Sequence, residues 1–154
     1  MATAESLTGG LVGATITTVP GASEVYRGGL ITYATELKAE LAGVAPSVLD
    51  ADGPVAPTTA AELARGAAQM CGADWGLATT GVAGPDPQDG HPVGQVFVAV
   101  ARSADAGSDD DGGELSKEGD RQVQVRELSL SGNRGEIRAQ TVTAVLALLL
   151  DTIS

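Results

Sequence analysis

A serine followed by two glycines, where a short apolar segment gives way to a helical pattern, constrains the fold of this chain more than any other feature. The segment reads Ala4-Glu5-Ser6-Leu7-Thr8-Gly9-Gly10. Its pattern predicts a strand over residues 2–5 and a helix over residues 8–19. In α/β proteins the N–H groups at such a helix start favour a phosphate or a developing oxyanion. We therefore expect Ser6 at the mouth of an anion-binding pocket.

The rest of the chain alternates strand patterns with helix patterns. Strands are predicted over residues 28–34, 74–80, 93–101 and 122–130, and helices over residues 35–42, 58–71 and 135–153. The alternation predicts an α/β fold with helices on both faces of a sheet and ligands near the carboxyl ends of its strands. Ser6, Tyr33 and Thr80 fall at such ends.

Three local patterns sharpen this prediction. The segment before residue 58 contains Pro46, Pro54 and Pro57 and is predicted as a loop. Thr59 and Glu62 have the spacing of a capping box at the start of the helix over residues 58–71. The apolar phase shifts within residues 122–130, which predicts either a bulge or burial on both faces of that strand.

Composition narrows the function classes. A chain of 154 residues with 43% apolar composition predicts one domain, and a net charge of -11 with 3% aromatic residues argues against a nucleic-acid partner. No secretion signal is apparent, and the longest apolar run, residues 144–150, is too short to cross a bilayer. The sequence predicts a soluble cytoplasmic protein without a membrane partner. Residues 103–120 are acidic and poor in apolar side chains, and predict a flexible surface insertion.

Elimination leaves a serine and a lysine as candidate catalytic residues. With one His and one Cys a zinc cluster is excluded, and a Ser-His-acid triad would need His91 from an irregular loop. Of the two lysines, Lys117 lies in the acidic insertion, so Lys38 is the candidate base near Ser6. A buried lysine with a lowered pKa can take the proton of a serine hydroxyl. Spacing alone leaves open that Ser6 is a helix cap and Lys38 a solvated charge.

Eight segments, in order along nearly the whole chain, carry a resemblance to a known family. They are residues 3–10, 20–23, 27–29, 32–33, 36–38, 80–85, 92–94 and 131–134. Together they resemble the CinA C-terminal domain family, which includes bacterial nicotinamide-nucleotide amidases. The resemblance implies a single three-layer α/β/α domain with a mostly parallel, mixed sheet. It also implies hydrolysis of nicotinamide mononucleotide to nicotinate mononucleotide and ammonia, in pyridine-nucleotide recycling, without a metal or other cofactor.

The same resemblance implies roles for individual residues. Ser6 is the expected nucleophile, Lys38 its base, and Tyr33 and Thr80 orient the dyad and the amide. The expected substrate-binding residues are Thr8, Gly9, Gly10, Gly81 and Arg134, with Gly9, Gly10 and Arg134 facing the phosphate. Backbone donors near Gly9-Gly10 or Thr80-Gly81 are expected to stabilise the oxyanion.

Departures from the family pattern keep alternatives open. Leu7 stands where the family usually has Cys, so no thiol can serve there, and Asn133 stands where Asp is usual. Members generally carry a helix and the start of the first strand before the segment that corresponds to residues 4–6. The chain is expected to bind a small nucleotide and to form a homo-oligomer. The alternatives are a non-catalytic ligand-binding or interaction module of the same fold, and a peptidase or esterase with a Ser-Lys dyad.

Overall fold

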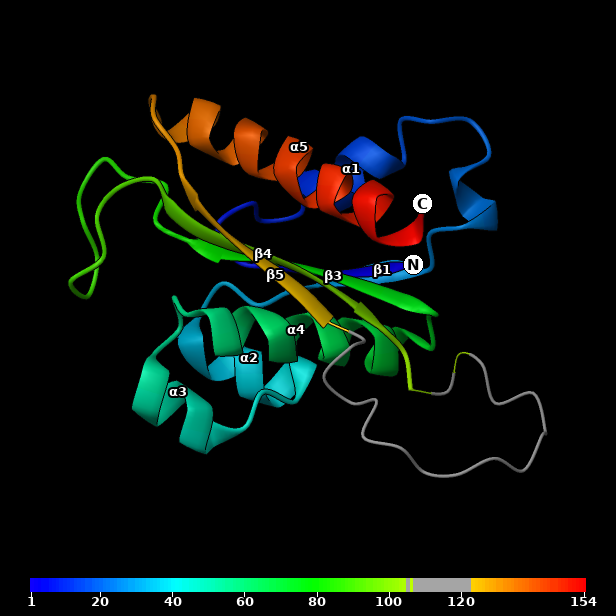
Figure 1. Cartoon of the computed structure of the whole chain (residues 1–154), viewed down its shortest axis with the longest axis horizontal. Helices are drawn as coiled ribbons and strands as arrows, with labels where there is room; N and C mark the ends of the chain where they lie inside the picture. The colour runs from blue at the N-terminus through cyan, green and yellow to red at the C-terminus, as the bar shows by residue number, and fades with distance from the viewer. Residues whose placement is uncertain (105, 107–122) are drawn as a thin grey trace.

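The computed structural model describes residues 1–104, 106 and 123–154 of the chain. Within these residues five strands form one mixed sheet in the order β2-β1-β3-β4-β5 (Figure 1). The strands are β1 (Ala2–Glu5), β2 (Gly28–Ile31), β3 (Trp75–Gly81), β4 (Gln95–Arg102) and β5 (Val123–Ser129). β1 pairs in parallel with β2 and β3, whereas β4 is antiparallel to both of its neighbours. The carboxyl ends of β1, β2 and β3 therefore lie together.

Helices cover both faces of this sheet. The helices are α1 (Leu11–Ile16), α2 (Thr35–Ala42), α3 (Pro46–Asp52), α4 (Pro57–Cys71) and α5 (Arg134–Ile153), with a short 3-10 turn η1 (Ala22–Glu24). Figure 1 shows α1 and α5 on one face and α2, α3 and α4 on the other. The three-layer α/β/α arrangement and the mixed sheet confirm the expected fold. Most of the predicted acidic insertion, residues 105 and 107–120, lies outside the described residues.

β4 shows how one strand serves two cores. Val96, Val98 and Val100 pack with α5, whereas Phe97, Ala99 and Ala101 pack with α4, because successive side chains of a strand point to opposite faces. The α4 face is lined mostly by alanines, so this helix lies close to the sheet. At Gly76 an added Cβ would lie 1.8 Å from the carbonyl oxygen of Ala64. Only glycine fits at this contact between β3 and α4.

The helix after Ser6 is shorter than predicted. It was expected over residues 8–19, but α1 covers only Leu11–Ile16. Gly9 and Gly10 have φ angles of 56° and 103°, in the left-handed region, which a right-handed helix cannot continue through. Residues 6–10 therefore form a separate turn between β1 and α1, here called the nucleophile turn after the role expected for Ser6.

The segment between α2 and α4 was also predicted wrongly, because it contains the helix α3 rather than a loop alone. Pro46 occupies the first turn of α3, where the missing N–H costs nothing. The predicted capping box of α4 does not form. The Thr59 hydroxyl donates to the Gly53 carbonyl, and the Glu62 carboxylate accepts from the Ala45 N–H.

A capping box does form at α5, where the Asn133 side chain accepts from the Glu136 N–H and the Glu136 carboxylate accepts from the Asn133 N–H. β5 has no bulge, because its ladder with β4 is continuous from Ser129 to Val123. The alternative prediction, burial on both faces, is wrong as well, because none of the residues of β5 is buried and only two half-buried side chains reach the core. Val123 packs on the α4 side and Leu128 on the α5 side.

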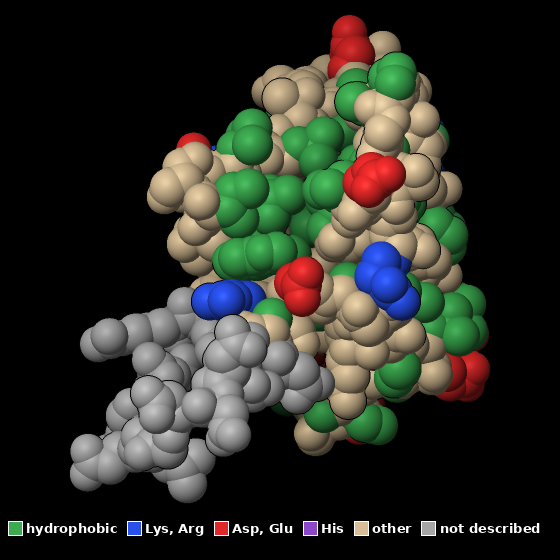
Figure 2. Space-filling model, turned by 90° about the vertical axis from the view of Figure 1, so that its right-hand side faces the viewer, with side chains coloured by type: hydrophobic (Ala, Val, Ile, Leu, Met, Phe, Trp, Pro, Cys, Tyr) green, Lys and Arg blue, Asp and Glu red, His purple; other side chains and the backbone are tan. Residues whose placement is uncertain are grey.

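An apolar surface lies at the end of the molecule where both termini are found. Figure 2 shows this end, with hydrophobic side chains gathered around a groove lined by Met1, Val25, Trp75, Leu149 and Ile153. The guanidinium of Arg102 lies over the Trp75 ring, 6.0 Å from its centre. This surface is at the opposite end of the sheet from the carboxyl ends of β1–β3. None of the helices in the described residues is long and apolar enough to cross a membrane.

Candidate active site

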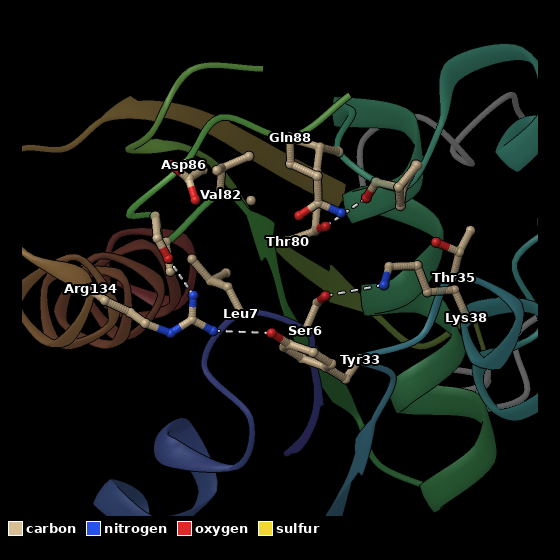
Figure 3. Close-up of a pocket in the computed structure, with 15 residues that line it drawn as sticks. Ser6, Leu7, Tyr33, Thr35, Lys38, Thr80, Val82, Asp86, Gln88 and Arg134 are labelled. Carbon is tan, nitrogen blue, oxygen red and sulfur yellow. Dashed lines mark hydrogen bonds between the residues drawn. The ribbon is translucent and has the colours of Figure 1, made fainter. Parts of the chain in front are cut away.

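A cavity lies where the carboxyl ends of β1, β2 and β3 meet. Its walls come from Ser6 and Leu7 after β1, from Tyr33, Thr35 and Lys38 after β2, from the stretch between β3 and residue 88, and from Arg134 at the start of α5. Figure 3 shows Ser6 near the middle, with Lys38 and Arg134 reaching in from opposite sides. Residues far apart in the sequence therefore meet in one site.

Ser6 and Lys38 form a hydrogen-bonded pair inside this cavity. Lys38 Nζ lies 3.1 Å from Ser6 Oγ and 2.7 Å from the carbonyl oxygen of Thr32 (Figure 3). Lys38 is only 1% exposed and Ser6 only 8%. The Thr32 carbonyl and the Ser6 hydroxyl occupy two of the hydrogen-bonding positions on Lys38 Nζ. The third position remains free for a proton or a lone pair.

Burial changes the acid–base behaviour of this lysine. Desolvation lowers the pKa of the Lys38 ammonium from 10.5 to about 8, and the Glu36 carboxylate opposes this shift only in part. A neutral amine is therefore accessible near physiological pH. A neutral amine in hydrogen-bond contact with a serine hydroxyl can act as its general base.

The nucleophile turn is held from within by Glu5. This carboxylate is 1% exposed and accepts hydrogen bonds from the N–H groups of Val12 (2.8 Å) and Gly13 (3.1 Å) and from the Thr8 hydroxyl (2.7 Å). Glu5 thus occupies the start of α1, the position at which an external anion would bind. The Ser6 N–H donates to the Thr79 carbonyl at 3.0 Å, which ties the turn to β3.

The rim of the cavity is built around Arg134. Its guanidinium donates to the carbonyl of Gly84 (2.5 Å) and to the hydroxyl of Tyr33 (3.0 Å). Both Arg134 and Tyr33 are exposed, Tyr33 to 60%. The described residues give this guanidinium no carboxylate partner. The rim therefore offers a positive charge to whatever enters the cavity.

The expected site residues divide into two groups. Ser6, Lys38, Tyr33, Thr80, Gly81 and Arg134 line one cavity. The Thr80 hydroxyl donates to the Pro54 carbonyl at 2.6 Å, so it holds the segment before α4 and keeps its oxygen free to accept. Among the described residues, neither Tyr33 nor Thr80 forms a hydrogen bond with the Ser6-Lys38 pair. No direct contact therefore supports the expectation that these two side chains orient the pair.

The second group, Thr8, Gly9 and Gly10, does not line the cavity. Thr8 is fully buried, and its hydroxyl is engaged by Glu5 and by Thr79. The Glu5 carboxylate already accepts hydrogen bonds from the N–H groups at the start of α1. The prediction of a phosphate site beside Gly9-Gly10 is corrected accordingly, because these donors are not open to a ligand. Arg134 is the member of the expected phosphate group that the structure brings to the cavity.

His91, the other side chain weighed as a general base in the sequence, lies outside the cavity. His91 is hydrogen-bonded to the Gln95 side chain at 2.8 Å and does not line the cavity, so it forms no triad with Ser6. In the part of the chain that the structure describes, no group of three or more His, Cys, Asp and Glu residues could hold a metal ion.

Sequence reasoning missed two residues beside Ser6, Glu5 and Arg138. Arg138 donates to the carbonyls of Leu7 (3.0 Å) and Thr8 (2.9 Å). A signal for Arg138 existed, because it follows Arg134 by four residues and so shares one face of α5. A signal for Glu5 also existed, since a carboxylate in an otherwise apolar strand segment calls for buried donors.

Comparison with known sequences gives a consistent result. The sequence model of the CinA C-terminal domain matches residues 1–111. A CinA-like protein of Frankia casuarinae is 42% identical over 149 residues, which cover 97% of this chain and 30% of that protein. A putative competence-damage inducible protein of Acetivibrio thermocellus is 44% identical over 143 residues, covering 92% of this chain and 30% of that protein. The chain thus spans about a third of the length of these relatives.

Solved structures agree with this result. The crystal structure of a competence/damage inducible protein from Agrobacterium tumefaciens superposes with a TM-score of 0.84 at 32% identity, covering 99% of this chain and 84% of that one. A CinA superfamily protein from Escherichia coli has a TM-score of 0.82 at 27% identity, covering 99% of this chain and 79% of that one.

Proposed function

The chain belongs to the CinA C-terminal domain family, and from this premise we propose that it is an amidohydrolase in which Lys38 activates Ser6. The observation that carries the proposal is the 3.1 Å contact between Lys38 Nζ and Ser6 Oγ in a buried site that lowers the lysine pKa to about 8. The proposed substrate is nicotinamide mononucleotide, which the family resemblance implies.

The proposed reaction begins with a proton transfer. Neutral Lys38 Nζ accepts the Ser6 hydroxyl proton while Oγ attacks the amide carbon, which gives a tetrahedral intermediate. Thr32 accepts a hydrogen bond from the resulting ammonium through its carbonyl. Lys38 then donates the proton to the amide nitrogen, the C–N bond breaks, and ammonia leaves an ester on Ser6.

The second half of the reaction uses water in place of serine. Lys38 takes a proton from a water molecule that attacks the ester carbon, and returns it to Ser6 Oγ as the ester bond breaks. The product is nicotinate mononucleotide, and the sum is amide plus water giving acid plus ammonia. Arg134 is proposed to hold the phosphate at the rim, since the described residues leave its charge unpaired.

Release of ammonia from nicotinamide mononucleotide by the purified chain tests this proposal. We expect turnover by the unmodified protein and none by Ser6→Ala, with Glu40→Ala as an exposed control on α2. Tight binding of the nucleotide without ammonia release would favour a non-catalytic module instead. Hydrolysis of simple esters or peptides in preference to the nucleotide would favour an esterase or peptidase with the same dyad.

A further inference from the structure

Arg138 binds two consecutive peptide carbonyls next to the nucleophile. Its Nε donates to Leu7 at 3.0 Å and its Nη2 donates to Thr8 at 2.9 Å. These contacts join α5 to a turn that lies more than 100 residues away in the sequence. A guanidinium suits this task because its donors are fixed in one plane, whereas a lysine ammonium has no such fork.

The turn that Arg138 holds presents a free donor beside Ser6. The Ser6 carbonyl accepts from the Gly9 N–H at 3.0 Å, and the Ser6 N–H donates to Thr79. Among the described residues no hydrogen bond uses the N–H of Leu7, which lines the cavity directly after Ser6. An N–H next to the attacking atom is within reach of the oxygen that becomes charged when Oγ adds to a carbonyl carbon.

We propose that Arg138 is a positioning residue, which fixes the Leu7 and Thr8 peptides so that the Leu7 N–H stabilises the oxyanion. This inference rests on the proposed role of Ser6 as the nucleophile. Arg138 itself does not line the cavity. It acts through the two carbonyls that it binds.

The geometry explains why this turn needs a clamp. Gly9 and Gly10 both have positive φ angles, so the turn contains two residues with wide conformational freedom. An oxyanion donor must be held within a few tenths of an ångström, because displacement of a donor by about 1 Å can cost about 100-fold in rate. Glu5 fixes the end of the turn at α1, and Arg138 fixes its middle.

The test compares kcat and KM for Arg138→Gln and Arg138→Lys on nicotinamide mononucleotide. We expect kcat to fall by about 10- to 100-fold while KM changes by less than about threefold, because the lost contact acts in the transition state. The pH at which the rate rises should stay unchanged, since the contact between Lys38 and Ser6 is intact. Guanidinium ion at millimolar concentration should restore part of kcat to Arg138→Ala but not to Arg138→Gln, whose side chain fills the gap.

Val142→Ala is the matched control. Val142 is buried on α5 in the same apolar cluster as Leu7, but its side chain has no donor that could bind the Leu7 and Thr8 carbonyls, so its truncation weakens apolar packing and leaves the contacts of Arg138 in place. We expect this variant to unfold more easily and to keep its kcat. If Val142→Ala lost kcat as Arg138→Gln does at equal stability, the effect would be structural and the proposal would be overturned. Arg138→Lys carries the comparison if Arg138→Gln does not fold.

A second readout does not depend on the natural substrate. A fluorophosphonate probe phosphonylates an activated serine, because the Oγ–P bond forms as the P–F bond breaks and fluoride leaves, and it places its P=O oxygen where an oxyanion would lie. We expect Arg138→Gln to slow labelling of Ser6 by about 10-fold or more. Equal labelling rates in the two proteins would overturn the role of Arg138. Labelling that depends on Arg138, without ammonia release by the unmodified chain, would refute the proposed substrate and leave this inference standing.

Discussion

The nucleophile turn and the rim at Tyr33 and Arg134 lie at the same end of the sheet, yet they hold their charges in different ways. In the turn, the Glu5 carboxylate is 1% exposed and is bound by two N–H groups and a hydroxyl. At the rim, the Arg134 guanidinium is exposed and touches one carbonyl and one hydroxyl. The Glu5 carboxylate therefore has its hydrogen-bond partners inside the protein, whereas the Arg134 guanidinium can still donate to a ligand.

This difference leads us to expect different effects from substitutions in the two regions. A buried polar network with every donor matched keeps atoms in place, and its loss is costly. An exposed charge is screened by water, so it contributes little to folding but can still attract a ligand of opposite sign. Substitutions in the turn and the adjacent dyad should therefore have large effects on rate or stability, and those at the rim small effects on binding.

The largest expected effect is the loss of the dyad. Ser6→Ala and Lys38→Met should each lower kcat by about 1,000-fold or more, and the double variant should be hardly worse, because the two groups act as one unit. Steady-state ammonia release by the three variants measures this. If the two losses in kcat multiplied in the double variant, Ser6 and Lys38 would contribute independently. That result would contradict the assignment of the two residues to one catalytic unit.

The next effect concerns stability. Glu5→Ala would leave the Val12 and Gly13 N–H groups and the Thr8 hydroxyl buried without an acceptor, which should lower the free energy of unfolding by about 3 kcal/mol. Urea denaturation measures the change, with the exposed Glu40→Ala as control, expected within about 0.5 kcal/mol of the unmodified protein. A change as small as that of the control would mean that the turn does not depend on its buried carboxylate.

A third effect follows from the pKa of Lys38. The neutral amine is the active form, so with a pKa of about 8 the rate should rise with pH. The neutral fraction increases by about tenfold between pH 7 and pH 9, and kcat should follow it. A profile of kcat against pH that is flat over this range, with chemistry limiting, would argue against Lys38 as the base.

The same pKa predicts a trend in stability. The folded chain releases the Lys38 proton near pH 8, whereas the unfolded chain holds it up to about 10.5, so the unfolded state binds more protons between these values. Stability relative to Lys38→Met should therefore rise with pH from about 8 to 10.5, by about 3 kcal/mol, and the cost of the buried charge is fully present below pH 8.

The smallest expected effect lies at the rim. Arg134→Gln should raise KM for nicotinamide mononucleotide by about fivefold, because an exposed charge-assisted hydrogen bond to phosphate is worth about 1 kcal/mol. Its stability should change by less than about 0.5 kcal/mol. The nucleoside without its phosphate should not distinguish the variant from the unmodified protein. A larger loss of stability than of affinity would place Arg134 with the nucleophile turn instead.

Sequence patterns predicted the elements of this fold better than their local details. Long periodic segments such as α4 and α5 carry many apolar positions, so single exceptions do not hide them. α3 was missed because Pro46 was taken as a helix breaker, although proline suits the first helical turn. α1 was predicted to start too early because the helical pattern of its side chains extends over two glycines whose φ angles keep the helix from starting before Leu11.

The candidate site was predictable in part for a similar reason. Ser6 and Lys38 were reached by elimination and resemblance, since few residue types in this chain can serve as nucleophile and base. The phosphate position was wrong because sequence does not say whether a helix start is open or filled. Glu5 precedes Ser6 directly, and only the three-dimensional fold shows that its carboxylate turns inward to Val12 and Gly13.

The contacts made by α5 also bear on when the site assembles during protein synthesis. Arg134 reaches Tyr33 across 101 residues, and Arg138 reaches Leu7 across 131 residues. During synthesis the N-terminal segments leave the ribosome first, so Ser6 and Lys38 emerge well before either arginine. Contacts of such long sequence separation form late, because the intervening loop must be closed first. We therefore expect the nascent chain to carry an incomplete, unreactive Ser6 site until α5 docks.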